Sequence, residues 1–550
     1  MRFKTIIKAG LVAVLVLGAT VGLLRDKVLL YLPGIVHSLK SPIAENRDVQ
    51  WQQMASAPRE GQPNVILILA DDLGFNDLSM GGQNPDPTVQ TPNIDAIASA
   101  GITFTNGYAA SATCAPSRAS LLTGRYATRF GFEYTPAPKE FMQLIYARGE
   151  GKEDIPSIYH KDREDQVPPM EEMGIPSSEI TLAELLKAKH YRSIMLGKWH
   201  LGEESDMRPG AQGFDEWLGF LPGASLYQSV GHGGIVESRQ SFDPIDEFLW
   251  ANIGYAVRFN GSDRFNPKGY MTDYLTSEAI KAVEANRDNP FFLYLSYNAP
   301  HTPLQAKQAD YDALSHITDH TERVYAAMIK SLDDNVGKLM TALKDQGLED
   351  NTIVIFTTDN GGAHYLGLAD VNAPYRGWKA TYFEGGIHAP FFMKWPAKIP
   401  AGKQYDQPVI SMDIFSTVAA AAGAELPADR VIDGVNLLPY IQGEKTGAPR
   451  DAIFWYQAGY EAVISNGWKL QRSDRADITW LFNLKDDPTE TTNIAEQNPS
   501  QVGKMLAMID EFKLQQAEPR WPALLEKSVP IDKTMAEPYE AGDEHVFWGN

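Results

Sequence analysis

Runs of apolar residues recur along the chain and predict buried β-strands. The first, Val65 to Ala70, is an uninterrupted apolar run of the kind found in strands that are covered on both faces. Similar runs follow at Arg192–Leu196, Phe291–Tyr297 and Thr352–Phe356. Helix-like stretches such as 178–189 and 325–344 separate these runs. The alternation of strand and helix predicts an α/β fold built on a parallel sheet.

The pattern changes past about Asp433, where shorter strand-like pieces are separated by turns such as Asn466-Gly467. These pieces lie at 452–456, 461–465, 468–472 and 479–483, and a helical stretch follows at 501–516. They predict a small antiparallel sheet and one helix. Because 550 residues exceed one ordinary core, we expect a catalytic domain over 63–435 and a C-terminal subdomain over 436–550.

The N-terminus has the pattern of an export segment. Three cations and no acid precede an uncharged apolar run from Ala9 to Leu24, which stops at Arg25. The run is shorter than the roughly 20 residues of a spanning helix, yet no small-residue cleavage site stands out at its end. We therefore expect a signal peptide or an uncleaved membrane anchor over 1–35, a linker over 36–62, and a periplasmic or extracellular location.

Charge and cysteine content narrow the classes of partner. Forty-nine Lys and Arg against seventy Asp and Glu leave a net charge of −21, which argues against nucleic acid or an anionic membrane surface as the main partner. The single cysteine, Cys114, cannot form a disulfide within the chain. Pro116 suits the first position of a helix, so we expect Cys114 at a helix N-terminus, where an anion is favoured.

Polar residues follow each of the four apolar runs. They are Asp71-Asp72, Lys198-Trp199-His200, His301 and Asp359-Asn360. Because ligands bind beyond the carboxyl ends of strands in open α/β sheets, we expect these residues to surround one cleft.

The segment from Cys114 to Arg125 reads C-A-P-S-R-A-S-L-L-T-G-R. It resembles the sulfatase signature C-x-P-S-R-x-x-x-L-T-G-R at every fixed position, and the chain is similar to the formylglycine-dependent sulfatases of the alkaline-phosphatase-like superfamily from about residue 64 onward. The resemblance implies a large mixed, mostly parallel sheet flanked by helices, with a smaller C-terminal antiparallel-sheet subdomain. It also implies that a maturation enzyme oxidises Cys114 to formylglycine (3-oxoalanine).

The resemblance further implies one calcium ion and a set of catalytic residues. The calcium ligands would be Asp71, Asp72, Asp359 and Asn360, with the modified Cys114 or the substrate completing the shell. Arg118 and His200 would serve the formylglycine hydrate, Lys198 and Lys379 would bind sulfate oxygens, and His301 would act near the leaving oxygen. Three carboxylates, three cations and Ca²⁺ would leave the cleft at +2, which suits a singly charged sulfate ester.

Two alternatives remain open from the residues. One is a phosphonate monoester or phosphodiester hydrolase of the same superfamily; the Asp359-Asn360 pair, where two-zinc relatives have Asp-His, favours one hard metal and sulfate chemistry. The other is a non-catalytic carbohydrate-binding or membrane-anchored scaffold, which would tolerate the loss of site residues, and none is missing. We expect a sulfated carbohydrate rather than an aryl sulfate as substrate, with specificity in segments 134–177 and 203–267, whose structure the sequence does not indicate.

Overall fold

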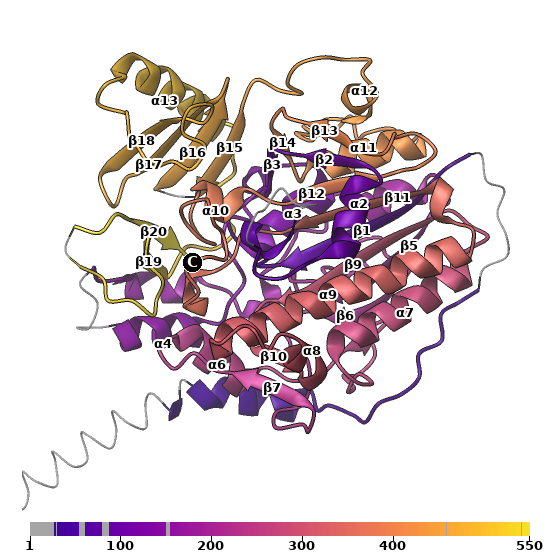
Figure 1. Ribbon diagram of the computed structural model, residues 1–550. Coiled ribbons are helices and arrows are strands. Elements are labelled where there is room, and N and C mark those ends of the chain that lie inside the picture. Colours follow the sequence, from indigo (N-terminus) through magenta and orange to yellow (C-terminus); the bar gives the residue numbers. More distant parts are fainter. Residues whose placement is uncertain are drawn as a thin grey trace, which may run out of the picture.

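The computed structural model describes residues 27–28, 30–53, 61–79, 87–149, 155–457, 459–540 and 542–550. Its central feature is a nine-stranded sheet. The strands are β1 (Asn64–Asp71), β2 (Ile102–Phe104), β5 (Arg192–Lys198), β6 (Glu216–Phe220), β8 (Arg258–Phe259), β9 (Phe291–Pro300), β11 (Thr352–Thr358), β12 (Phe391–Lys394) and β13 (Lys403–Tyr405). Their spatial order is β13-β2-β12-β11-β1-β9-β5-β6-β8 (Figure 1).

The middle of this sheet is parallel. Strand β1 pairs in parallel with β11 and β9, and β5 pairs in parallel with β9 and β6. Antiparallel neighbours, β12 on one side and β8 on the other, make the sheet mixed. The predicted fold class is therefore confirmed, and the four predicted strands are β1, β5, β9 and β11.

Both faces of β1 are covered, which explains its uninterrupted apolar sequence. Ile66 and Ile68 belong to a core shared with helices α2 (Pro92–Ser99), α7 (Met271–Asn286) and α9 (His320–Asp345). Val65 and Leu67 point the other way, into a core shared with α3 (Cys114–Thr123), α5 (Leu182–Lys187) and α11 (Asp413–Ala422). Each fully buried Val, Leu or Ile contributes about 1.5–3 kcal/mol, so this strand holds both layers against the sheet.

A second, antiparallel sheet follows as predicted. Its strands are β15 (Ile453–Gln457), β16 (Tyr460–Ser465), β17 (Trp468–Ser473) and β18 (Ile478–Asn483), in that order. Asn466 and Gly467 both have positive φ, 52° and 81°, which a two-residue hairpin loop between β16 and β17 requires. Helix α13 (Pro499–Lys513) covers the sheet through Met505 and Ile509.

The two segments left unassigned by the sequence contain short elements. Residues 134–177 form α4 (Lys139–Gly149) and β4 (Ile158–Tyr159), and β4 joins a small sheet with β19 (Leu525–Pro530) and β20 (His545–Gly549). Residues 203–267 supply β6 and β8 of the main sheet, helix α6 (Pro244–Asn252), and β7 (Ile235–Ser238), which pairs with β10 (Leu304–Lys307). These elements are too short to produce a readable hydrophobic period.

Five further short strands and α-helices and an N-terminal helix are present, besides several single-turn 3-10 helices. The five are β3 (Gly107–Tyr108), which pairs with β14 (Val409–Ile410), and α8 (Gln308–Ala313), α10 (Glu384–Ile387) and α12 (Leu438–Ile441). Residues 30–40 are helical, so the expected linker begins inside a helix. The apolar run at 9–24 lies outside the described residues. None of the described helices combines the length and apolar character that crossing a bilayer requires.

Candidate active site

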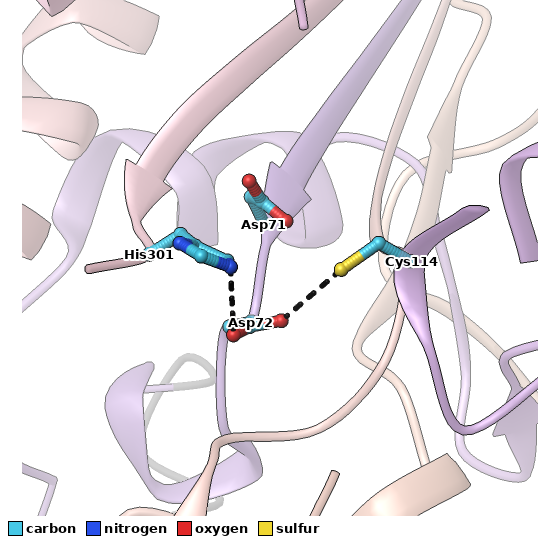
Figure 2. A group of neighbouring side chains, drawn as sticks. All are labelled: Asp71, Asp72, Cys114 and His301. Atoms are coloured by element: carbon cyan, nitrogen blue, oxygen red, sulfur yellow. Dashed lines mark hydrogen bonds and ion pairs between the residues drawn. The ribbon is translucent and has the colours of Figure 1, made fainter. Parts of the chain in front are cut away.

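The carboxyl ends of β1, β5, β9 and β11 bring the predicted polar residues to one edge of the sheet. Asp71 is the last residue of β1, Lys198 the last of β5, and Asp359 follows β11 directly. His301 follows β9. Figure 2 shows Asp71, Asp72 and His301 facing the side chain of Cys114. The expected convergence on one site is thus present.

Three cations and three carboxylates are paired in this site. The ammonium of Lys198 lies 2.7 Å from both carboxylate oxygens of Asp71. Arg118 binds Asp359 through Nε at 2.8 Å and Nη2 at 2.7 Å, and its Nη2 lies 3.4 Å from Asp71. All four side chains are fully buried. Because charges this deep are stable only when paired, the pairing fixes the positions of the groups.

Asp72 lies at the centre of the cluster. Its backbone has φ 59°, a left-handed conformation that turns the chain sharply after β1. Its carboxylate accepts hydrogen bonds from Lys379, Asn360 and Tyr365, each at 2.8 Å. Burial would raise the pKa of Asp72, but the charges of Lys379 and His301 lower it below its usual range. Asp72 is therefore ionised at neutral pH.

Cys114 is the first residue of α3, after the N-cap Thr113. The predicted position at a helix N-terminus is confirmed, although Pro116 is the third helical residue rather than the first. The thiol Sγ lies 3.6 Å from Asp72 Oδ1. Burial opposes ionisation of this thiol, but the fields of Lys198 and Lys379 outweigh burial and lower its pKa below the usual value.

His301 and Lys379 face each other across Asp72. Their Nε2 and Nζ atoms are 3.5 Å apart, and His301 Nε2 lies 3.5 Å from Asp72 Oδ2. Burial would lower the pKa of His301, but Asp72 and Asp71 raise it above the usual value. Burial would also lower the pKa of Lys379, but the charge of Asp72 outweighs burial and raises this pKa well above the usual value. Without a metal ion, the two carboxylates therefore favour the protonated form of His301.

His200 carries a buried Nδ1 that has no hydrogen-bond partner. The residue has φ 61°, and its ring packs so closely on Gly223 that a Cβ there would lie 2.6 Å from the imidazole. Burial, with the fields of Lys198 and Arg118, holds the pKa of His200 well below its usual value. The imidazole is therefore neutral.

This site contains a group of side chains able to hold a metal ion. Asp71, Asp72, Cys114 and His301 offer ligand atoms that all lie within 4.8 Å of one another. Asn360 carries a buried Oδ1 that has no hydrogen-bond partner. Asp359 Oδ1 accepts a hydrogen bond from the Asp72 backbone, so this carboxylate also borders the cluster. The three carboxylates and three cations cancel, and a divalent ion would leave the site positive.

Two contacts were not predicted from the sequence. Tyr365 donates a hydrogen bond to Asp72 and accepts one from Lys379 at 3.2 Å. Ser296, on β9, accepts a hydrogen bond from Arg118. Neither residue stands in a recognisable motif. Their one signal is position, because Ser296 lies near the carboxyl end of a buried strand and Tyr365 soon follows the Asp359-Asn360 pair.

A buried ionic network supports the loop that carries Lys379. Glu384, at the start of α10, binds Lys469 of β17 at 2.7 Å, and Lys469 also lies 3.0 Å from Glu490. His388 contacts Glu384 at 2.8 Å. Burial raises the pKa of Glu490 to about 7, whereas Lys469 outweighs burial at Glu384 and lowers its pKa to about 2. The antiparallel sheet is thereby joined to the active-site loop.

Comparisons with known proteins identify the family. The Sulfatase family model matches residues 63–424, and a model described as N-sulphoglucosamine sulphohydrolase, C-terminal, matches 377–516. N-acetylgalactosamine-6-sulfatase of Mus musculus is 34% identical over 421 residues, covering 75% of this chain and 72% of the relative. Steryl-sulfatase of Rattus norvegicus is 31% identical over 495 residues, covering 79% of each chain.

A solved structure agrees with these relatives. The crystal structure of Ps i-CgsB in complex with k-i-k-neocarrahexaose is 32% identical, has a TM-score of 0.69, and covers 84% of this chain and 94% of its own. The Sulfatase match spans the main sheet and the paired charges of the site, Asp71, Asp72, Arg118, Lys198, Asp359 and Lys379. The chain therefore belongs to the sulfatase family, whose members are sulfuric ester hydrolases.

Proposed function

We propose that this sulfatase hydrolyses sulfate monoesters of carbohydrates, using a nucleophile made from Cys114 and one calcium ion. The observation that carries the proposal is the position of Cys114 among paired charges. Its thiol contacts Asp72, and the ammonium of Lys379 contacts the same carboxylate. An ester held here would meet a nucleophile, cations and a proton donor together.

The cations would bind the sulfuryl oxygens. Lys198 and Lys379 are the two ammonium groups whose fields reach Cys114. In a buried site, cations fixed in advance stabilise the charge of a transition state more strongly than water does. Arg118 would hold the carboxylate of Asp359 in place. The same contact would fix the position of the Arg118 guanidinium in the site.

His301 would protonate the leaving oxygen. Its Nδ1 lies 2.6 Å from the backbone oxygen of Thr302, so Nδ1 carries a proton and the ring orientation is fixed. Nε2 points toward Asp72 and Lys379 and is the atom available for proton transfer. Without a metal ion, the charges of Asp72 and Asp71 raise the pKa of His301, which favours the protonated ring.

Two groups would complete the site. Calcium, held by Asp71, Asp72, Asp359 and Asn360, would act as a Lewis acid and orient the nucleophile. Formylglycine would supply a hydrated aldehyde: one hydroxyl would be the nucleophile toward sulfur, and loss of the other hydroxyl's proton to a base would let sulfate leave as the aldehyde re-forms. A maturation enzyme would be needed to make it. The carboxylates of Asp71 and Asp72, whose ligand atoms lie within 4.8 Å of each other, and the buried Oδ1 of Asn360, which has no partner, support the calcium proposal.

A carbohydrate substrate and an exported location complete the proposal. Of the relatives above, one is named for a sulfated N-acetylgalactosamine and one is bound to neocarrahexaose, whereas the third is named for steroid sulfates. The cationic start and apolar run at residues 1–24 support export to the periplasm or cell exterior, with the leader cleaved or kept as an anchor.

The test compares sulfated monosaccharides, sulfated oligosaccharides, a steroid sulfate and an activated aryl sulfate as substrates of the purified enzyme. We expect release of sulfate from a sulfated sugar at a higher kcat/KM than from the steroid sulfate. Cys114→Ala should abolish release from every substrate while the unfolding midpoint stays close to that of the wild type. Preference for the steroid sulfate would contradict the carbohydrate proposal, and turnover by Cys114→Ala would contradict the nucleophile.

A further inference from the structure

The helix of residues 30–40 carries an apolar face that no described part of the chain covers. Its exposed side chains are Tyr31 (49%), Leu32 (49%), Ile35 (55%), Val36 (38%) and Leu39 (79%). With Val28 and Ile43, these make seven of the twelve large apolar side chains that are exposed among the described residues. Contiguous exposed apolar patches are uncommon on soluble proteins and mark interaction surfaces.

The opposite side of the same helix is fixed to the protein. Leu30 is buried and belongs to a cluster with Leu144 of α4 and Phe248 of α6. Gly34 lies so close to α6 that a Cβ would approach the backbone oxygen of Ala251 to 2.9 Å, and its N–H donates to Asn252 at 2.6 Å. In Figure 1 the helix lies beside α4 and α6 at the edge of the molecule.

This docking sets the direction of the apolar face. Leu30 and Gly34 are four residues apart and therefore lie on one side of the helix. Asn252 also donates to the backbone oxygen of Leu30 at 2.7 Å, so both turns are held. The helix cannot rotate to bury Ile35 and Leu39 without breaking these contacts. The exposed face is a consequence of how the helix is anchored.

The sequence before the helix indicates what covers this face. The uncharged apolar run Ala9–Leu24 ends three residues before Lys27, a distance of at most about 11 Å of extended chain. If the run enters a bilayer, the helix must begin at the bilayer surface. Lys27 and Lys40 are exposed at either end of the helix, where their ammonium groups can reach the headgroups. Interfacial helices combine these features.

We propose that residues 30–39 lie in the surface of a lipid bilayer, with Tyr31, Leu32, Ile35, Val36 and Leu39 inserted among the acyl chains. A net charge of −21 gives no general attraction to anionic headgroups, so the binding energy must come from the apolar face. The body of the enzyme would then be held against the membrane through α4 and α6. This proposal goes beyond the hydrolytic function and does not depend on the chemistry at Cys114.

The experiment uses the full chain reconstituted into phosphatidylcholine vesicles. Ile35→Cys is labelled with the environment-sensitive fluorophore NBD, and Leu514→Cys, at an 88% exposed position outside the helix, is the matched control. Cys114 is buried, and the chain without an added cysteine, treated with the same reagent, measures any label on Cys114. We expect a blue shift and quenching by doxyl-labelled lipid at position 35, and neither effect at position 514. Equal responses at the two positions would overturn the proposal.

Two further outcomes are distinguished by the same label. A blue shift at position 35 that occurs without vesicles and resists doxyl-labelled lipid would mean that a second copy covers the face, and would overturn the proposal. Adding Leu32→Asp and Leu39→Asp to the labelled protein should reduce quenching roughly tenfold or more, whereas Leu514→Asp should not. Unchanged hydrolysis of a soluble aryl sulfate shows that the charged variant is folded, and undiminished quenching in that folded variant would contradict insertion.

Discussion

Replacing Lys379 by methionine tests the proposed binding of the sulfuryl group. The ammonium lies 2.8 Å from Asp72, and its side chain is 12% exposed. In a buried active site, removing one hydrogen-bond donor that stabilises the transition state lowers the rate by about 10²- to 10³-fold. This factor corresponds to about 3–4 kcal/mol of transition-state stabilisation. We therefore expect Lys379→Met to lower kcat/KM for an aryl sulfate by that factor.

The same substitution has a second effect, on stability. Breaking a buried ion pair costs about 3–5 kcal/mol of folding free energy. Because Asp72 keeps its hydrogen bonds from Asn360 and Tyr365, we expect Lys379→Met to destabilise the fold by about 3 kcal/mol or less. Calcium should restore more stability in Lys379→Met than in the wild type, because the cation would replace the lost charge on Asp72.

The assays are steady-state hydrolysis of an aryl sulfate and chemical unfolding with and without calcium. Lys307→Met is the control, because Lys307 is paired with Asp273 at 2.9 Å outside the site; it should leave kcat/KM unchanged. Retention of more than about a tenth of the wild-type kcat/KM by Lys379→Met, under 1.4 kcal/mol of lost stabilisation, would refute the reasoning.

Three other perturbations follow from the same geometry. Chelation of divalent ions should lower activity, and calcium should restore it; full activity in protein shown to be metal-free would argue against the oxygen-ligand site. In chelated protein, the raised pKa of His301 should stabilise the fold fully below pH 6.5 and progressively less as pH rises through the folded-state value; denaturant titrations of His301→Gln should lack this dependence. Lys469→Met should destabilise the protein by about 3–5 kcal/mol, since two buried carboxylates lose their cation. Adding Glu490→Gln to Lys469→Met should recover part of that stability. If Lys469→Met leaves the stability unchanged, the assigned ionic network is contradicted.

The sequence predicted the elements whose burial is uniform. Strand β1 lies between two cores, so its apolar run is continuous and its end at Asp71 can be located from the pattern. The hairpin at Asn466-Gly467 was equally readable, because its turn requires two residues with positive φ. Strand ends in turn predicted the convergence of Asp71, Lys198 and Asp359.

Other features depend on contacts that no local pattern encodes. Tyr365 reaches Asp72 only because the loop after β11 folds back over the site. The sequence pattern assigns the helix at 30–40 partly to a linker, because its buried side consists only of Leu30 and Gly34 and gives little amphipathic signal. His200 was predicted for the site, but its close contact with Gly223 depends on a neighbouring strand connection. Tertiary packing decides all three.

The most direct measurement is mass spectrometry of the peptide that contains residue 114, from enzyme whose sulfatase activity has been assayed in the same preparation. If a nucleophile made from Cys114 carries out hydrolysis, the active enzyme contains the aldehyde at this position, and specific activity rises in proportion to the aldehyde fraction. A fully active preparation in which residue 114 is wholly an unmodified thiol would contradict the account.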